Sequence, residues 1–409
     1  MHTLLLILIL SILVFEFGLN RFLSVLNIRN SKLPLPPELS GIYSPESYAR
    51  QQEYFRTNVR FGTYSATFNL LLVAGMYLTG GFGWLDSWLI GFISNEILRS
   101  LLFFGILFLI SDVLMIPFDV YDTFVIEEKY GFNKVTPSLF IIDKLKSIVL
   151  MVLLAGPLLA LLIWIYQLTS DYFWLLTFGI VTIVGLVLSM FYSEWIVPLF
   201  NKQTPLEEGE LREAISGFAD KAGFRLDNIY VIDGSRRSTK ANAYFSGLGS
   251  RKRIVLYDTL IQQMTTDEIV AVLAHEVGHY KHKHVLKGLI LSLPFNLLLF
   301  YLLGLTLKSD LPALAIGGSA ATFHLNAIVF FSLYTPVSSA FDLVGNMMSR
   351  RHEYQADAYA VRFGYGDHLV SSLKKLSATS LSNLMPHPFY VFFNYSHPTL
   401  YQRIKNINR

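Results

Sequence analysis

Residues 148–168 read IVLMVLLAGPLLALLIWIYQL, a stretch without one charged side chain. The hydrocarbon core of a bilayer is about 30 Å thick, and roughly 20 apolar helical residues are needed to cross it. A surface helix of a soluble protein would instead carry polar residues along one face. This stretch therefore predicts a membrane-spanning helix.

Six further stretches resemble residues 148–168, which makes seven predicted membrane helices in all. They cover residues 3–19, 65–84, 99–118, 148–168, 172–196, 286–307 and 324–345. Of the 409 residues, 53% are hydrophobic and only 15% are charged, so a bilayer must solvate much of the surface. The first segment lacks a charged leader and is read as a retained helix. We expect a mainly α-helical, multi-pass membrane protein.

Charges in the connecting loops predict how these helices are oriented, because Lys and Arg accumulate in short cytoplasmic loops. Basic residues crowd the loops after the first and third helices, whereas the connections after helices two, four and six hold at most one each. The N-terminus is then predicted to face outward. The polar stretches 201–285 and 346–409 would both lie on the cytoplasmic side.

This alternation predicts four divisions of the chain. Residues 1–200 would hold helices one to five, and residues 286–345 helices six and seven. Residues 201–285 and 346–409 would form one split domain, in which Asn228–Ile232, Arg253–Tyr257 and Asn242–Phe245 are predicted to be short strands. The formal charge is only +3 and the basic residues are dispersed, so nucleic-acid binding is not expected.

Several ionisable residues fall inside or at the ends of the apolar stretches, where exposure to lipid is costly. Two interpretations are open: polar contacts between packed helices, or a hydrated cavity enclosed by the helices. These residues are Glu16, Asp112, Asp119, Glu194 and Asp342.

The split domain contains a candidate metal site in His275-Glu276-Val277-Gly278-His279. Thr265 to Glu268 matches a helix capping box, and apolar residues at helical spacing follow it. Two histidines four residues apart share a helix face and can bind one zinc ion, with Glu276 beside them as a general base. The alternative is that both are ordinary helix residues. Cysteine is absent, which leaves imidazole and carboxylate as the strong ligands.

A catalytic zinc site needs a third protein ligand and one open position. Position 285 is Val, so a third histidine at the metzincin spacing is excluded. Glu353 and Asp357 are four residues apart, which allows Glu353 to ligate zinc while Asp357 accepts the free N–H of a zinc-bound histidine. Alternatively, both are solvated surface carboxylates. His282 and His284 are expected to have structural or interfacial roles, since further ligands would close the coordination sphere.

These residues belong to a longer series of motifs that resembles the type I CAAX prenyl endopeptidases, a family of integral-membrane zinc proteases. The resemblance covers nearly the whole chain. It also includes Phe124–Lys134, Pro198–Phe200, Asp233–Ser238, Asn242–Phe245, Arg253–Leu256 and Ser396–Pro398. It implies seven helices in a barrel around a water-filled chamber, closed by a gluzincin-like cytoplasmic zinc-protease domain with a small β-sheet.

The resemblance also implies an activity and its residues. The family removes the last three residues from proteins that end in a prenylated cysteine. One zinc ion would be held by His275, His279 and Glu353, with Glu276 as the base. Asn242, Ala243 and Tyr244 would belong to an edge strand that pairs with the peptide substrate. His397 and Arg403 match a segment near the active site, where His397 would donate to the oxyanion or serve only in packing, and Arg403 would bind substrate.

Two departures from the eukaryotic family pattern leave the membrane and the substrate open. The loop between helices six and seven is short, and the sequence ends without an endoplasmic-reticulum retention signal. The expected location is therefore a bacterial inner membrane or the endoplasmic reticulum. A quality-control protease that ignores prenylation is one alternative function, and a zinc-regulated transporter or channel is another.

Overall fold

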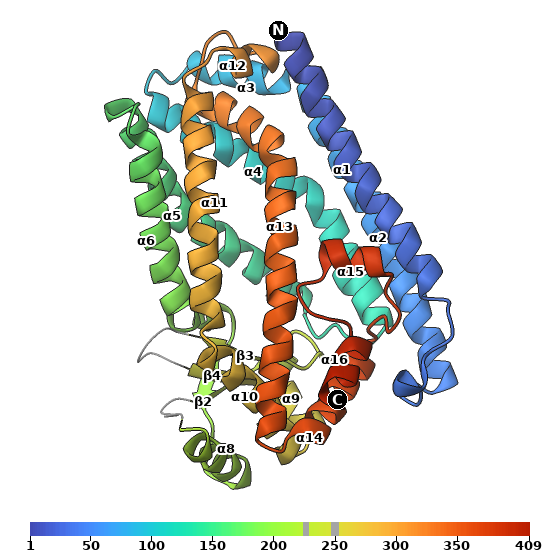
Figure 1. The fold of residues 1–409 in the computed structure, drawn as a ribbon. Coiled ribbons are helices and arrows are strands. Elements are labelled where there is room, and N and C mark those ends of the chain that lie inside the picture. Colours follow the sequence, from blue (N-terminus) through green and yellow to red (C-terminus); the bar gives the residue numbers. More distant parts are fainter. Residues whose placement is uncertain (224–228, 247–252) are drawn as a thin grey trace.

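The computed structural model describes residues 1–223, 229–246 and 253–409. The molecule is mainly helical, with long helices that stand side by side and a smaller mixed domain at one end (Figure 1). The long helices, with the short α3, are α1 (His2–Asn30), α2 (Pro45–Leu78), α3 (Gly81–Ile90), α4 (Glu96–Tyr121), α5 (Pro137–Leu168), α6 (Phe173–Phe191), α11 (His284–Leu307) and α13 (Phe323–Arg362).

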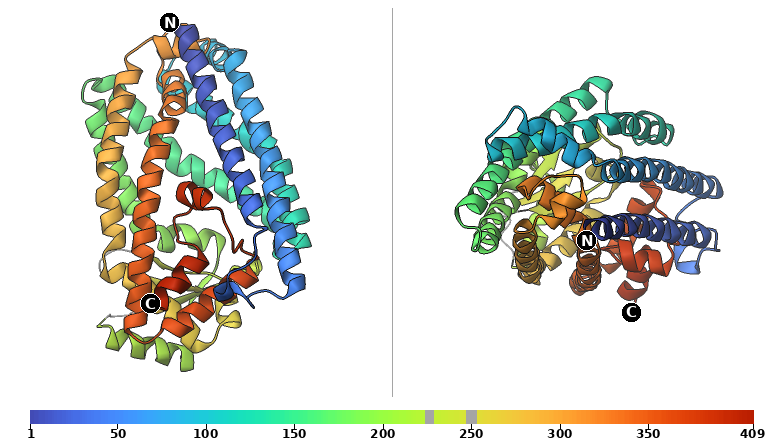
Figure 2. Two further views of the ribbon diagram at one scale, coloured as in Figure 1. Left: turned by 45° about the vertical axis from the view of Figure 1, so that its right-hand side comes forward. Right: turned by 90° about the horizontal axis from the view of Figure 1, so that it is seen from above.

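The long helices form a closed ring of contacts. Helix α1 packs against α2, which reaches α4 through α3 and the π-helical turn η2 (Asp122–Glu127). The series continues through α5, α6, α11 and α13, and α13 packs back against α1. The view from above shows these helices arranged around a central region (Figure 2).

Five of the seven predicted membrane segments lie on one helix each, the fifth continues from α6 into η3 (Tyr192–Ile196), and the second is divided between α2 and α3. Among the described residues, six helices are long and apolar enough to cross a membrane, and α2 with α3 counts as a seventh only if this pair, bent by 61°, is one span. The bend arises at Gly80, whose φ of 67° ends α2. The Gly83 N–H then donates to the Ile316 carbonyl at 3.1 Å and holds α3 against the end of α12 (Leu311–Ala315).

Short elements lie between the long helices and within the mixed domain. They are η1 (Pro37–Leu39), η3 (Tyr192–Ile196), α7 (Val197–Phe200), η4 (Gly234–Arg236), α9 (Asp258–Gln263) and α12 (Leu311–Ala315). The domain's helices are α8 (Glu210–Lys221), α10 (Thr266–Lys281), α14 (Gly366–Thr379), α15 (Pro388–Asn394) and α16 (Leu400–Ile407).

The mixed domain contains a four-stranded sheet with the order β1-β2-β4-β3. The strands are β1 (Gln203–Pro205), β2 (Ile229–Ile232), β3 (Ala243–Ser246) and β4 (Arg253–Tyr257). Only β2 and β4 run parallel, so the sheet is mixed. The three predicted strands match β2, β3 and β4 within a residue or so, although Asn228 lies outside the described residues. Within the described part of the sheet, β3 stands at an edge.

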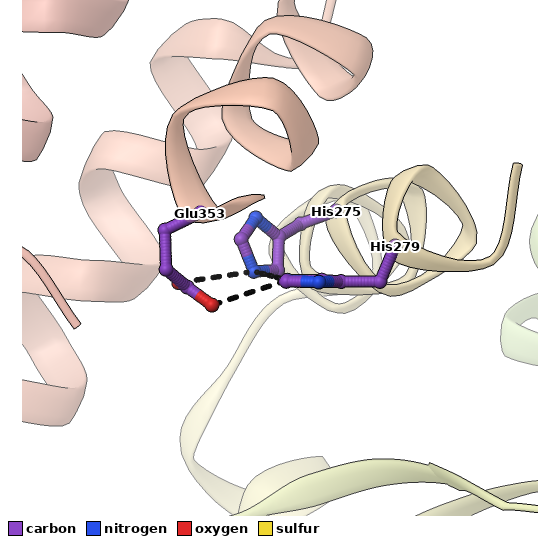
Figure 3. A group of neighbouring side chains, drawn as sticks. All are labelled: His275, His279 and Glu353. Atoms are coloured by element: carbon purple, nitrogen blue, oxygen red, sulfur yellow. Dashed lines mark hydrogen bonds and ion pairs between the residues drawn. The ribbon is translucent and has the colours of Figure 1, made fainter. Parts of the chain in front are cut away.

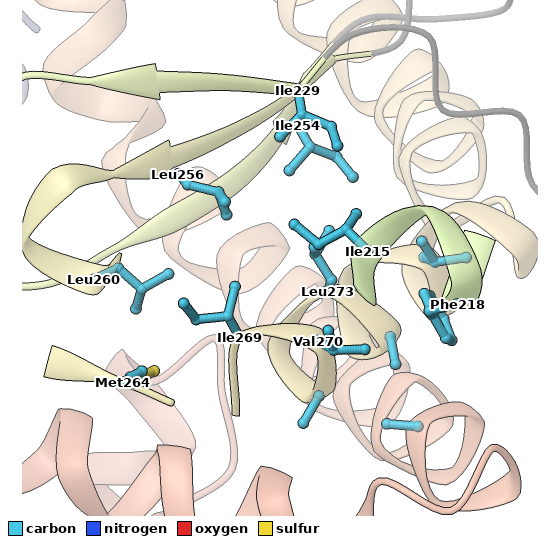
Figure 4. Close-up of a cluster of buried hydrophobic side chains, with 14 of the residues drawn as sticks. Ile215, Phe218, Ile229, Ile254, Leu256, Leu260, Met264, Ile269, Val270 and Leu273 are labelled. Carbon is cyan, nitrogen blue, oxygen red and sulfur yellow. The ribbon is translucent and has the colours of Figure 1, made fainter. Parts of the chain in front are cut away.

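The sheet and α10 bury a common apolar core. Leu256 of β4 and Ile215 of α8 are fully buried beside Val270 and Leu273 of α10 (Figure 4). These α10 residues recur at the spacing of one helix face, so the sequence orients that face toward the sheet. The opposite face of α10 remains available for α13, which it contacts extensively.

Most of the acids predicted within the apolar stretches have polar partners. Lys144 Nζ lies 2.6 Å from Asp112 and 2.9 Å from Asp119. An ion pair of 3.1 Å joins Arg253 to Glu194, and the Ser339 hydroxyl donates to Glu16 at 3.4 Å. The helix-packing interpretation applies to Asp112, Asp119 and Glu16, whereas Glu194 pairs with strand β4. Asp342 instead lines a pocket of about 620 Å³ beside α11 and α13.

Candidate active site

Helix α10 begins at the predicted capping box, which fixes its position. The Thr265 side chain accepts from the Glu268 N–H, and Glu268 Oε2 accepts from the Thr265 N–H at 2.9 Å. The same carboxylate accepts from Ser371 at 2.7 Å and from Lys375 at 2.6 Å, both in α14. Burial opposes the charge of Glu268, but these contacts outweigh it and lower its pKa to about 2. Glu268 thus connects α10 to α14 as well as capping it.

Gly278 permits the close approach of α10 and α13. A Cβ at this position would lie 2.9 Å from Tyr359 Cβ and 3.0 Å from Ala356 Cα. Carbon atoms that are not bonded normally stay at least about 3.5 Å apart, so only glycine fits here. The motif His275–His279 alone did not predict this role of Gly278.

This approach brings together the three predicted ligands, His275, His279 and Glu353 (Figure 3). The two Nε2 atoms are 3.1 Å apart. His275 Nε2 lies 3.5 Å from Glu353 Oε2, and His279 Nε2 lies 3.2 Å from Glu353 Oε1. Glu353 is only 3% exposed, which excludes the solvated-carboxylate alternative.

The spacing of these atoms fits a zinc ion. Zinc–nitrogen and zinc–oxygen bonds of about 2.0–2.1 Å at tetrahedral angles separate the ligand atoms by roughly 3.3 Å. The observed separations of 3.1 to 3.5 Å lie around that value. Glu353 Oε2 is buried and forms no hydrogen bond, although Arg403 Nη1 lies 3.4 Å away, so its lone pairs are available to a metal ion. The donor set of two imidazoles and one carboxylate is also typical of catalytic zinc.

A buried ion pair supports the His275 side of the site. Asp357, which is fully buried, places Oδ1 2.9 Å from His275 Nδ1. Arg403 donates to both Asp357 oxygens, from Nε at 3.0 Å, and its Nη1 lies 3.4 Å from Glu353. Burial opposes the charge of Arg403, but Asp357 outweighs it, so the pKa of the guanidinium is above its ordinary value.

The His279 side has a different set of partners. His284 Nδ1 lies 3.0 Å from His279 Nδ1, and His284 Nε2 lies 2.8 Å from Gln355 Oε1. The rings of His352 and His282 stack on His284, with centroid distances of 3.9 and 5.5 Å. The sequence offers no signal for Gln355, because its partner lies 71 residues away.

A pocket of about 990 Å³ opens onto the three candidate ligands. Glu276 lines it next to His275, and Asn242 and Ala243 line it from the β3 side. His397 also lines the pocket, with Nε2 3.5 Å from Glu353 and a side chain that is 63% exposed. Arg403 reaches the pocket too, although its hydrogen bonds go to Asp357. The Tyr244 side chain is 3.5 Å from Ser193.

Fold and site together define a class of protein. One helix carries His-Glu-X-X-His, a second helix brings a buried carboxylate to it, and apolar helices form a ring. These are the features of an integral-membrane zinc metallopeptidase.

Comparisons with known proteins agree with this class. Residues 24–202 match the family described as CAAX prenyl protease N-terminal, five membrane helices, and residues 205–409 match peptidase family M48. The chain is 35% identical to CAAX prenyl protease 1 of Saccharomyces cerevisiae, covering 91% of this chain and 88% of that protein. It is 32% identical to the CAAX prenyl protease 1 homologue of Homo sapiens, with the same coverage.

A solved structure shows the same fold. The crystal structure of S. mikatae Ste24p has a TM-score of 0.92 and 33% identity, covering 98% of each chain. The chain therefore belongs to peptidase family M48 and, within it, to the CAAX prenyl proteases. It is a membrane zinc metallopeptidase that acts on peptides or proteins.

Proposed function

We propose that this enzyme is a CAAX prenyl protease, which removes the last three residues from proteins that end in a prenylated cysteine. The observation that carries the proposal is the convergence of His275, His279 and Glu353 in a chain that spans nearly the full length of relatives with that name.

In this proposal one zinc ion is held by His275, His279 and Glu353, which leaves one position open. Zinc bound there would polarise the scissile carbonyl and lower the pKa of a bound water toward neutrality. Asp357 accepts the His275 Nδ1–H and keeps the Nε2 lone pair directed at the metal.

Glu276 acts as the general base. It follows a ligand on α10 and lines the same pocket, where its carboxylate can take a proton from the attacking water. The same carboxylate then gives that proton to the leaving amine. His397 donates a hydrogen bond to the oxyanion that develops, for which its exposed ring at the pocket edge is suited.

The substrate binds as an extended strand beside β3. An edge strand has unpaired backbone N–H and C=O groups that can pair with a peptide. Asn242 and Ala243 line the pocket, and the backbone of Tyr244 continues the same edge. Arg403 lies at the pocket wall and contributes to substrate binding through its charge.

The membrane arrangement completes the proposal. Seven spans form a barrel around a water-filled chamber, and residues 201–285 and 346–409 form one gluzincin-like domain that faces the cytoplasm. The ring of helix contacts and the loop charges support this arrangement. The membrane would be the endoplasmic reticulum or a bacterial inner membrane, and family membership favours a peptidase over a transporter.

The test is cleavage of two CAAX peptides that differ only in farnesylation, by the purified full-length protein in detergent. E276Q serves as the blank. The proposal expects a strong preference for the farnesylated peptide. Equal cleavage of both would contradict it and favour a quality-control protease that does not depend on prenylation.

A further inference from the structure

His284 is held against a proposed zinc ligand by the corner between α10 and α11. Lys283 has φ 55° and ψ 38°, a left-handed conformation that residues other than glycine adopt at a cost of about 1 kcal/mol or more. This corner ends α10 and returns the chain so that His284 faces His279. His284 is only 5% exposed, and both of its ring nitrogens have partners.

The positions of the protons along this chain of contacts follow from His279. If Nε2 of His279 binds a metal, that atom carries no proton, so the ring proton is on Nδ1. The Nδ1–H then donates to His284 Nδ1 across 3.0 Å, and His284 must accept. A neutral His284 therefore carries its own proton on Nε2, 2.8 Å from Gln355 Oε1.

In its observed orientation, Gln355 favours this arrangement. Its amide oxygen can only accept a hydrogen bond, so it selects the His284 tautomer with the proton on Nε2. The opposite orientation of the amide would donate to His284 Nε2. That would place the His284 proton on Nδ1, direct it at His279 and force the His279 proton onto Nε2, which blocks metal binding.

We propose that His284 and Gln355 are positioning residues, which fix the tautomer and the ring plane of His279 for zinc. They act on His279 as Asp357 acts on His275, but through a neutral imidazole and amide instead of a carboxylate. The inference rests on the proposed ligation of zinc by His279. His352 stacks flat on the His284 ring, at 3.9 Å and 10°, and helps to hold its plane.

The test compares the zinc affinity of full-length variants by competition with a chromogenic chelator. H284F keeps an aromatic ring but removes the acceptor, and we expect zinc binding about 10- to 100-fold weaker than in the wild type. H284N places an amide oxygen near the position of Nδ1, so it should recover part of the loss. H368F changes a histidine of α14 that does not line the pocket, so it should bind zinc like the wild type.

Two further variants make each outcome decisive. If H279A still binds zinc normally, the proposed ligation fails; if H279A loses zinc while H284F binds it normally, only the present inference is overturned. If H284F does not fold in sufficient amount to be measured, Q355L provides the second test. Weaker zinc binding is expected for Q355L, because His284 is then free to adopt the wrong tautomer, and unchanged binding would contradict the proposal.

Discussion

At the scale of single residues, the two histidines proposed to bind zinc occupy similar places in the motif but have different surroundings. His275 faces the buried carboxylate of Asp357, which is ion-paired with Arg403, whereas His279 faces a second imidazole. A carboxylate partner makes an imidazole more basic than a neutral partner does. The site therefore combines one proposed ligand that a carboxylate polarises, His275, with one that a neutral imidazole orients, His279.

Glu276 should be essential for turnover but not for metal binding. E276Q removes the proton acceptor and keeps the side chain's size, so we expect a normal zinc content and a fall in kcat of about 100-fold or more. Zinc stoichiometry and steady-state kinetics of the same preparation would check this. A variant that hydrolyses peptide near the wild-type rate would refute the assignment of the base.

Glu353 should be essential for metal binding itself. E353A removes the proposed carboxylate ligand and leaves His275 and His279 without a third partner, so most of the zinc should be lost on dialysis. H397A is the matched control from the same pocket: it should keep its zinc and lose about 100-fold in kcat through the oxyanion contact. An E353A protein with one zinc per chain would exclude Glu353 as a ligand.

At the scale of elements, the site depends on how two helices from distant parts of the chain meet. Helix α10 supplies both histidines and α13 supplies Glu353, and Gly278 allows the two to touch. The capping box and the contacts of Glu268 with α14 determine where α10 begins. Changes in either feature should therefore disturb the metal site from a distance.

G278A should separate α10 from α13. Its methyl group would overlap Tyr359 and Ala356, which we expect to cost about 1–3 kcal/mol and to weaken zinc binding. G217A in α8 is the control, because a Cβ there meets nothing within 4 Å. It should leave zinc binding unchanged and raise stability slightly, by up to about 1 kcal/mol. Thermal melts with and without added zinc would distinguish G278A from G217A. A G278A protein with wild-type affinity for zinc would argue against the close approach of α10 and α13.

Glu268 should make the stability of the domain depend on pH. Its pKa is about 2 in the folded protein against 4.5 ordinarily, so its contribution is complete above about pH 4.5 and is lost as the pH falls toward 2. E268Q should therefore lower the free energy of unfolding by about 1–3 kcal/mol near neutral pH, with Lys375 partly screened by solvent.

Melting temperatures measured from neutral pH down to about pH 3 would check this prediction. The gap between wild type and E268Q should narrow as the pH falls. D267N changes an exposed carboxylate in the same helix turn, so it should have little effect at any pH. A gap that stays constant with pH would contradict the assignment.

At the scale of the whole molecule, sequence patterns predicted the structural features that depend on residues close together in the chain. Long apolar stretches placed the membrane helices, and the capping box placed the start of α10. The pairing of Glu353 with two distant histidines could also be predicted, because zinc chemistry restricts the third ligand.

Features that join distant segments without a chemical rule could not be predicted. Asp86, Ser100 and His324 form a buried network, in which His324 lies 2.8 Å from each partner. These residues come from α3, α4 and α13, and nothing in their local sequence links them. The bend at Gly80 and the contact of His279 with His284 likewise depend on how whole helices pack. His352 is half-buried for the same reason.

The measurement that tests the central claim most directly is mass spectrometry of the products made from a farnesylated CAAX peptide, before and after zinc is removed by a chelator. We predict a single new product that lacks the last three residues, lost on chelation and restored by zinc. Cleavage that continues unchanged in the protein stripped of zinc would contradict the account.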